Sequence, residues 1–205
     1  MRKILFLPGA GGSPEFWRPV ANLLQGSREK ELFGWPGLGD QPHDPAISGI
    51  DDLVRLVDAK IDGPVDLVAQ SMGGVIAARI ALARPAEVGR LVLAVTSAGV
   101  NMQQSGASDW RADYRRQYPK AAGWITGERA AVELPVERIT APTLLIWGDA
   151  DPISPVAVGR HLEACMPNAR LHVVPGGDHG LASTRAEFVA PLIASHLSES
   201  HDEGH

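Results

Sequence analysis

Ser71 is the side chain whose surroundings suggest nucleophilic chemistry most directly. It lies near the end of Val65-Asp66-Leu67-Val68-Ala69-Gln70-Ser71-Met72-Gly73-Gly74, where a buried-strand pattern gives way to small residues and then to an apolar helical pattern. A serine on such a strand-to-helix turn projects its Oγ above the sheet edge, and the N–H groups of the helix start point to the same space. The pattern is G-x-S-x-G with Ala69 at the first glycine. Taken alone, it fits equally well a glycine-rich turn with a capping serine.

A serine nucleophile needs a general base, and the base needs an acid to orient it. Downstream of Ser71, the apolar run Thr143–Trp147 is followed by Asp149 and Asp151, and a later apolar run is followed by His179 among glycines. Since the carboxyl ends of parallel strands meet at one edge of a sheet, these side chains are expected to lie together. The order Ser, Asp, His is the one expected for α/β hydrolases. The spacing therefore predicts a triad with Ser71 and His179, and with one of the two aspartates as the acid.

Short apolar runs alternate along the chain with segments of helical spacing. Strands that are apolar throughout and alternate with helices indicate a parallel sheet covered on both faces. We therefore predict an α/β fold of three layers, with about six mostly parallel strands and helices on both faces. The predicted strands are Ile4–Leu7, Glu31–Phe33, Val65–Ala69, Leu91–Val95, Thr143–Trp147 and Leu171–Val174, and the predicted helices follow apolar stripes near residues 16–24, 50–61 (with Ser48 as N-cap), 75–83, 156–166 and 188–197.

Composition limits the class of protein. The chain has 205 residues, 44% of them hydrophobic, and a net charge of −5, which fits a single domain over residues 1–205 and disfavours a general nucleic-acid binder. One cysteine cannot form an internal disulfide, and no apolar run approaches the roughly 20 residues of a transmembrane helix. We therefore expect a cytoplasmic protein without membrane or nucleic-acid partners. Glycine and proline make up about a fifth of the chain, above the usual 12% or so, and they lie at the joints between elements.

One stretch, roughly residues 100–141, holds no convincing strand but several aromatic and basic side chains. Its positive excess is small, with four positive and two negative side chains over residues 108–120, so nucleic-acid binding is disfavoured. An insertion of this length is usually functional, and we interpret it as a short lid. The alternative is a solvated helical excursion with aromatic residues tucked beneath it. The polar tail 198–205 is expected to fray. Candidate pocket walls are Trp17, Leu38, Trp110 and Trp124.

Taken together, these motifs resemble the α/β-hydrolase superfamily, in particular its small single-domain serine hydrolases, over nearly the whole chain. The resemblance implies that the loop Pro8-Gly9-Ala10-Gly11-Gly12, which has proline in place of the usual histidine, supplies an oxyanion donor from the N–H of Ala10. The N–H of Met72 would be the second donor. A family turn of the form P-G-x-G-x-S matches Pro36–Asp40, except that Asp40 replaces serine. The family's G-x-x-D pattern favours Asp151 as the acid, with Asp149 as the alternative.

The function predicted on these grounds is hydrolysis of a small carboxylic ester or thioester through an acyl-enzyme, with no cofactor and no metal. The expected partner is a small-molecule acyl substrate, and the sequence makes no prediction of the oligomeric state. The same triad could instead serve carbon–carbon bond hydrolysis, lyase-type elimination or perhydrolysis. A binding module that reuses the pocket is a further alternative, against which the intact Ser-Asp-His order argues.

Overall fold

A parallel sheet forms the centre of the protein, which was analysed as a computed structural model that describes residues 2–101, 105–127 and 133–198. The sheet has the order β2-β1-β3-β4-β5-β6, and every pair of neighbouring strands is parallel. The predicted fold class and strand positions are confirmed, with boundaries that shift by up to three residues. Within the described residues the six strands are β1 (Lys3–Leu7), β2 (Lys30–Leu32), β3 (Val65–Gln70), β4 (Val88–Ala94), β5 (Thr143–Gly148) and β6 (Ala169–Val174).

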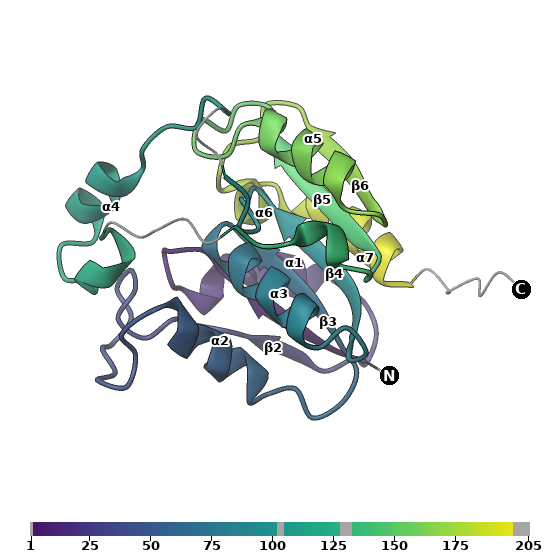
Figure 1. Ribbon diagram of the computed structural model, residues 1–205, viewed down its shortest axis with the longest axis horizontal. Coiled ribbons are helices and arrows are strands. Elements are labelled where there is room, and N and C mark those ends of the chain that lie inside the picture. The colour runs from purple at the N-terminus through teal and green to yellow at the C-terminus, as the bar shows by residue number, and fades with distance from the viewer. Residues whose placement is uncertain (1, 102–104, 128–132, 199–205) are drawn as a thin grey trace, which may run out of the picture.

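Helices cover both faces of this sheet (Figure 1). The helices α1 and α7 pack together on one face, whereas α3 and α5 cover the other, where α2 packs against α3. Coverage on both faces explains why β3 and β5 are buried along their whole length. The helices are α1 (Arg18–Leu23), α2 (Ile50–Asp58), α3 (Met72–Ala83), α4 (Arg111–Gln117), α5 (Val156–Cys165), α6 (Leu181–Thr184) and α7 (Ala186–Ser198), with the 3-10 turns η1 (Pro14–Phe16), η2 (Gly123–Ile125) and η3 (Val136–Arg138).

The start of α2 differs from the sequence prediction. Gly49, not Ser48, occupies the N-cap position. The Asp52 carboxylate reaches back from the first turn and accepts hydrogen bonds from the backbone N–H groups of Ser48 and Gly49 and from the Ser48 hydroxyl. These bonds lower the pKa of Asp52. The Asp52 carboxylate thus satisfies the backbone N–H of the N-cap residue, which is one half of a capping box, whereas a serine N-cap would accept N–H groups inside the first turn of the helix.

The segment between β4 and β5 holds α4, η2 and η3, and its described residues form no strand, as the sequence predicts. Figure 1 shows α4 standing away from the sheet, beside the loop that joins β2 to α2. Residues 102–104 and 128–132 of this segment lie outside the described residues, as do residues 199–205 of the predicted frayed tail. The role of the segment as a short lid stays a prediction.

Candidate active site

Ser71 sits between β3 and α3 in a backbone conformation that side chains rarely adopt. Its φ is 52° and its ψ is −123°, in a region of the φ/ψ map that costs free energy and persists only where the surroundings hold it. Those surroundings are tight: a Cβ on Gly73 would lie 2.4 Å from the carbonyl oxygen of Leu7. Thr96 lies just after β4, and its hydroxyl donates to the Ser71 carbonyl at 2.5 Å. The small residues around the serine are therefore required by the close approach of β1 and α3.

His179 lies between Ser71 and Asp151 and contacts both. Its Nε2 is 3.0 Å from the Ser71 Oγ, and its Nδ1 is 2.7 Å from Asp151 Oδ2. The Asp151 side chain is completely buried, while 24% of the His179 side chain is exposed. The second oxygen of Asp151 accepts the backbone N–H groups of Ile153 and Ser154, at 2.8 and 3.1 Å. The loops after β3, β5 and β6 thus bring the three side chains into one hydrogen-bonded chain.

The other acidic residues near the histidine point elsewhere. Asp149 is exposed, and its Oδ1 accepts the backbone N–H of Gly176 at 2.5 Å, so that it braces the loop after β6. Asp178 accepts the backbone N–H of Gly180, two residues further on. Of the two aspartates considered, Asp151, which the family pattern favours over Asp149, is the one hydrogen-bonded to His179 in the structure.

The loop after β1 and the start of α3 carry the two predicted oxyanion donors. Ala10 and Met72 are both partly exposed, and Met72 is the first residue of α3, where a backbone N–H has no acceptor within the helix. Two buried indole groups hold the start of the loop after β1 in place. The indole of Trp17 donates to the Leu7 carbonyl at 3.0 Å, and the indole of Trp35 donates to the Pro8 carbonyl at 2.8 Å.

The four candidate pocket residues fall into two groups. Trp17 and Leu38 have no exposed surface, so neither forms an open pocket wall in this structure. Trp110 and Trp124 belong to the segment between β4 and β5 and are partly exposed. Trp110 packs edge-on against Tyr114, with ring centroids 5.5 Å apart. Contact of these two tryptophans with a substrate stays a prediction.

Two residues that the sequence analysis did not single out contact the site. Gln70, directly before the serine, is buried, and its side-chain N–H donates to the carbonyl of His179 at 3.1 Å. Tyr114 on α4 donates from its hydroxyl to the Ala10 carbonyl at 2.8 Å. Gln70 could have been suspected from its place inside the serine motif. No local pattern marks Tyr114, since its partner lies 104 residues away in the chain.

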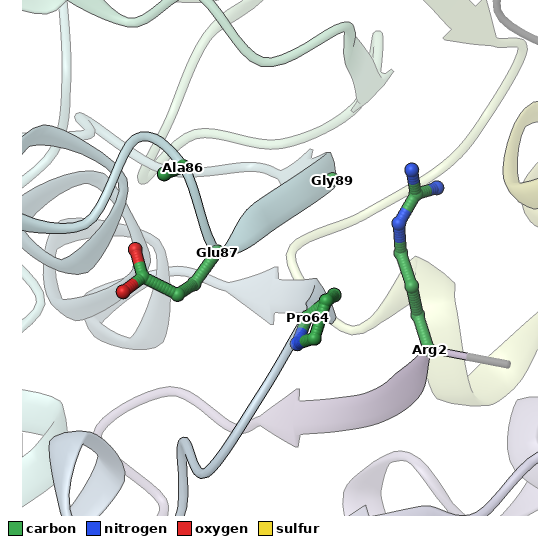
Figure 2. A pocket seen from close by; sticks show the side chains of 5 residues that line it. All are labelled: Arg2, Pro64, Ala86, Glu87 and Gly89. Atoms are coloured by element: carbon green, nitrogen blue, oxygen red, sulfur yellow. The ribbon is translucent and has the colours of Figure 1, made fainter.

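A separate hollow of about 350 Å³ lies at the opposite edge of the sheet (Figure 2). It is lined by Arg2, Pro64, Ala86, Glu87 and Gly89, which lie at or near the amino ends of β1, β3 and β4. None of these residues approaches the Ser71 site, and open parallel sheets place their ligands at the carboxyl ends of the strands.

Across residues 2–101, 105–127 and 133–198, no three His, Cys, Asp or Glu side chains are grouped closely enough to hold a metal ion. Over the same ranges, every helix is too short or too polar to cross a bilayer.

Residues 4–192 match the profile of the Alpha/beta hydrolase family. The chain belongs to this family. This α/β hydrolase is 28% identical to a poly(3-hydroxyalkanoate) depolymerase of Ectopseudomonas oleovorans, over 96% of the chain and 84% of that protein. It is 23% identical to a pimeloyl-[acyl-carrier protein] methyl ester esterase of Neisseria meningitidis, over 99% of the chain and 79% of the relative. Among solved structures, carboxylesterase CesB from Bacillus subtilis superposes with a TM-score of 0.75 at 16% identity, covering 96% of this chain and 84% of the other.

Proposed function

We propose that this α/β hydrolase is a serine esterase that cleaves small carboxylic esters or thioesters through an acyl-enzyme. The observation that carries the proposal is the position of His179, whose two ring nitrogens lie 3.0 Å from Ser71 Oγ and 2.7 Å from Asp151 Oδ2. This arrangement suits a base that accepts the serine proton on one nitrogen while the other stays protonated toward the aspartate. Relatives named as an ester esterase and a polyester depolymerase support an ester as the substrate class.

In the first half of the reaction, Ser71 Oγ attacks the substrate carbonyl carbon as its proton moves to His179 Nε2. Asp151 stabilises the resulting imidazolium and holds the ring in place. The negative charge that develops on the carbonyl oxygen is stabilised by the N–H groups of Ala10 and Met72. Collapse of the tetrahedral intermediate breaks the bond to the alcohol or thiol, which leaves with the proton from His179.

In the second half, water replaces the departed group. His179 takes a proton from this water as its oxygen attacks the acyl carbon. The second tetrahedral intermediate collapses to release the carboxylic acid, and the proton returns to Ser71 Oγ. Each half therefore uses the same base and the same two donors, which is why one site of this kind completes the whole reaction.

The test is Ser71→Ala assayed with p-nitrophenyl acetate. We expect kcat to fall by at least about 10³-fold, because the nucleophile is lost while the donors remain. A fluorophosphonate probe should label the wild type at Ser71. Ser183→Ala, which removes a hydroxyl on α6 four residues after His179, is the matched control and should retain both activity and labelling. Full activity in Ser71→Ala would refute the proposal.

The substrate class is tested by a panel of acyl-chain lengths, offered as simple esters and as coenzyme-A thioesters. We expect turnover of the esters or thioesters that depends on Ser71 and is faster than cleavage of other bonds, such as the carbon–carbon bond of a β-diketone. Strong β-diketone cleavage beside weak ester turnover would assign the same three side chains to carbon–carbon bond hydrolysis instead.

A further inference from the structure

Tyr114 joins three segments of the protein through a single oxygen atom. It lies on α4, and only 8% of the residue is exposed. Its hydroxyl donates to the carbonyl of Ala10 at 2.8 Å and accepts the backbone N–H of Gly39 at 2.9 Å. Burial raises the pKa of the phenol, so at neutral pH the hydroxyl keeps the proton that it donates.

The first of these bonds fixes the residue proposed as an oxyanion donor. On one side of Ala10, the carbonyl of Gly9 accepts the N–H of Gly12 at 3.1 Å in a tight turn. Because the C=O and N–H of a trans peptide point in opposite directions, this turn directs the Ala10 N–H away from Gly12. On the other side of Ala10, the carbonyl is the group that Tyr114 holds. Both peptide units that flank Ala10 are therefore oriented by hydrogen bonds.

The loop needs this external support because three of its residues are glycines. Glycine populates many backbone conformations, so a glycine-rich loop gains little rigidity from its own sequence. The turn Pro36–Asp40 supports the loop through close contact, since a Cβ on Gly39 would lie 2.0 Å from the Gly11 carbonyl oxygen. Gly39 in turn donates to Tyr114. The two glycine turns and the tyrosine thus form one packed unit.

Residues just after α4 are attached to the loop that joins β2 to α2. The N–H of Ala122 donates to the carbonyl of Gly37 at 2.7 Å. His43 Nε2 lies 2.8 Å from the carbonyl of Lys120. In this structure, α4 and the residues after it are therefore docked onto the loop that follows β2, and Tyr114 extends that docking to the loop after β1.

We propose that Tyr114 is a positioning residue for the oxyanion donor Ala10, so that docking of α4 completes the oxyanion hole. The inference rests on the proposed function, because it assigns a role within that reaction. A misdirected donor weakens binding of the transition state more than binding of the substrate. Loss of the hydroxyl should therefore lower kcat and leave KM nearly unchanged.

The experiment compares Tyr114→Phe with Tyr118→Phe. Both variants remove one hydroxyl from adjacent tyrosines whose rings pack together with centroids 5.0 Å apart. The Tyr118 hydroxyl accepts from the side chain of Gln117 at 3.1 Å and borders the same loop, 3.8 Å from where a Cβ on Gly11 would stand. The pair therefore compares a hydroxyl that is hydrogen-bonded to Ala10 with a neighbouring hydroxyl that only lies beside the loop. Removal of an oxyanion donor costs about 10²–10³-fold in kcat, so loss of its positioning should cost about 10–100-fold. Tyr118→Phe should stay within about twofold of wild type.

The readouts separate positioning from general destabilisation. Rates are expressed per site titrated with a fluorophosphonate, which counts the folded, competent enzyme. A boronic acid, whose serine adduct mimics the tetrahedral intermediate, should bind Tyr114→Phe more weakly by the same factor as the loss in kcat, whereas KM for p-nitrophenyl acetate should change less than about threefold. Wild-type kcat per labelled site, or a loss confined to KM, would overturn the inference. Those outcomes leave the Ser71→Ala result intact, so failure of this inference can be distinguished from failure of the proposed function.

Discussion

Replacement of Asp151 by asparagine tests the role of the acid in the proposed reaction. In the wild type, Oδ1 of Asp151 accepts two backbone N–H groups, from Ile153 and Ser154, and Oδ2 faces His179 Nδ1. An asparagine has one oxygen, which the two backbone donors should retain. Its NH2 group must then face His179 Nδ1, which can accept this bond only in the tautomer that carries its proton on Nε2.

That tautomer cannot accept the proton of Ser71. We therefore expect Asp151→Asn to lower kcat by about 10⁴-fold, which is the effect of the same substitution in a well-studied serine protease triad. The loss corresponds to about 5.5 kcal/mol of activation free energy. Because the substitution preserves shape and both backbone hydrogen bonds, thermal unfolding should show a folded protein.

Asp149→Asn is the matched control. Its Oδ1 accepts a single backbone N–H, from Gly176, and an asparagine oxygen can do the same. Steady-state hydrolysis of p-nitrophenyl acetate by this variant should stay within about threefold of wild type. The reasoning is refuted if Asp151→Asn keeps more than a tenth of wild-type kcat, or if Asp149→Asn shows the larger loss.

Two further predictions concern stability. A Cβ on Gly73 would lie 2.4 and 2.5 Å from the backbone oxygens of Leu7 and Pro8, so Gly73→Ala should lower the free energy of unfolding, measured in urea, by about 1–3 kcal/mol. The control is Gly63→Ala, whose Cβ meets nothing within 4 Å and whose free energy of unfolding should stay within about 0.5 kcal/mol of wild type. Equal effects of the two substitutions would contradict the packing argument. Hydrogen bonds to the carboxylate lower the pKa of Asp52, so its contribution to stability is present above the ordinary aspartate pKa and is lost as pH falls through the lowered value. The stability advantage of wild type over Asp52→Asn should therefore be larger at pH 6 than at pH 3, and an advantage that is independent of pH would contradict this.

The elements of the fold could be predicted from the sequence because their signals are local. Runs such as Thr143–Trp147 are apolar at every position, which is typical of strands covered on both faces. The turn around Ser71 could also be predicted from the sequence, because small residues are required wherever a strand and a helix approach so closely. From strand order alone, Ser71 and His179 were predicted to share one edge of the sheet, and the structure brings them within 3.0 Å.

Other features depended on contacts between distant segments. Asp149 and Asp151 both follow β5, and periodicity does not distinguish two residues of one loop. In the structure, Asp149 turns to the loop after β6, whereas Asp151 turns inward to His179.

The sequence by itself therefore determined the architecture, the serine turn and the edge at which the polar side chains gather. Only the tertiary structure decided which aspartate meets the histidine, that Trp17 is buried behind the loop after β1, and that Tyr114 holds Ala10. The physical reason is that strands and tight turns are specified by neighbouring residues. The direction of a loop side chain, in contrast, is set by hydrogen-bond partners that the fold brings in from up to about a hundred residues away.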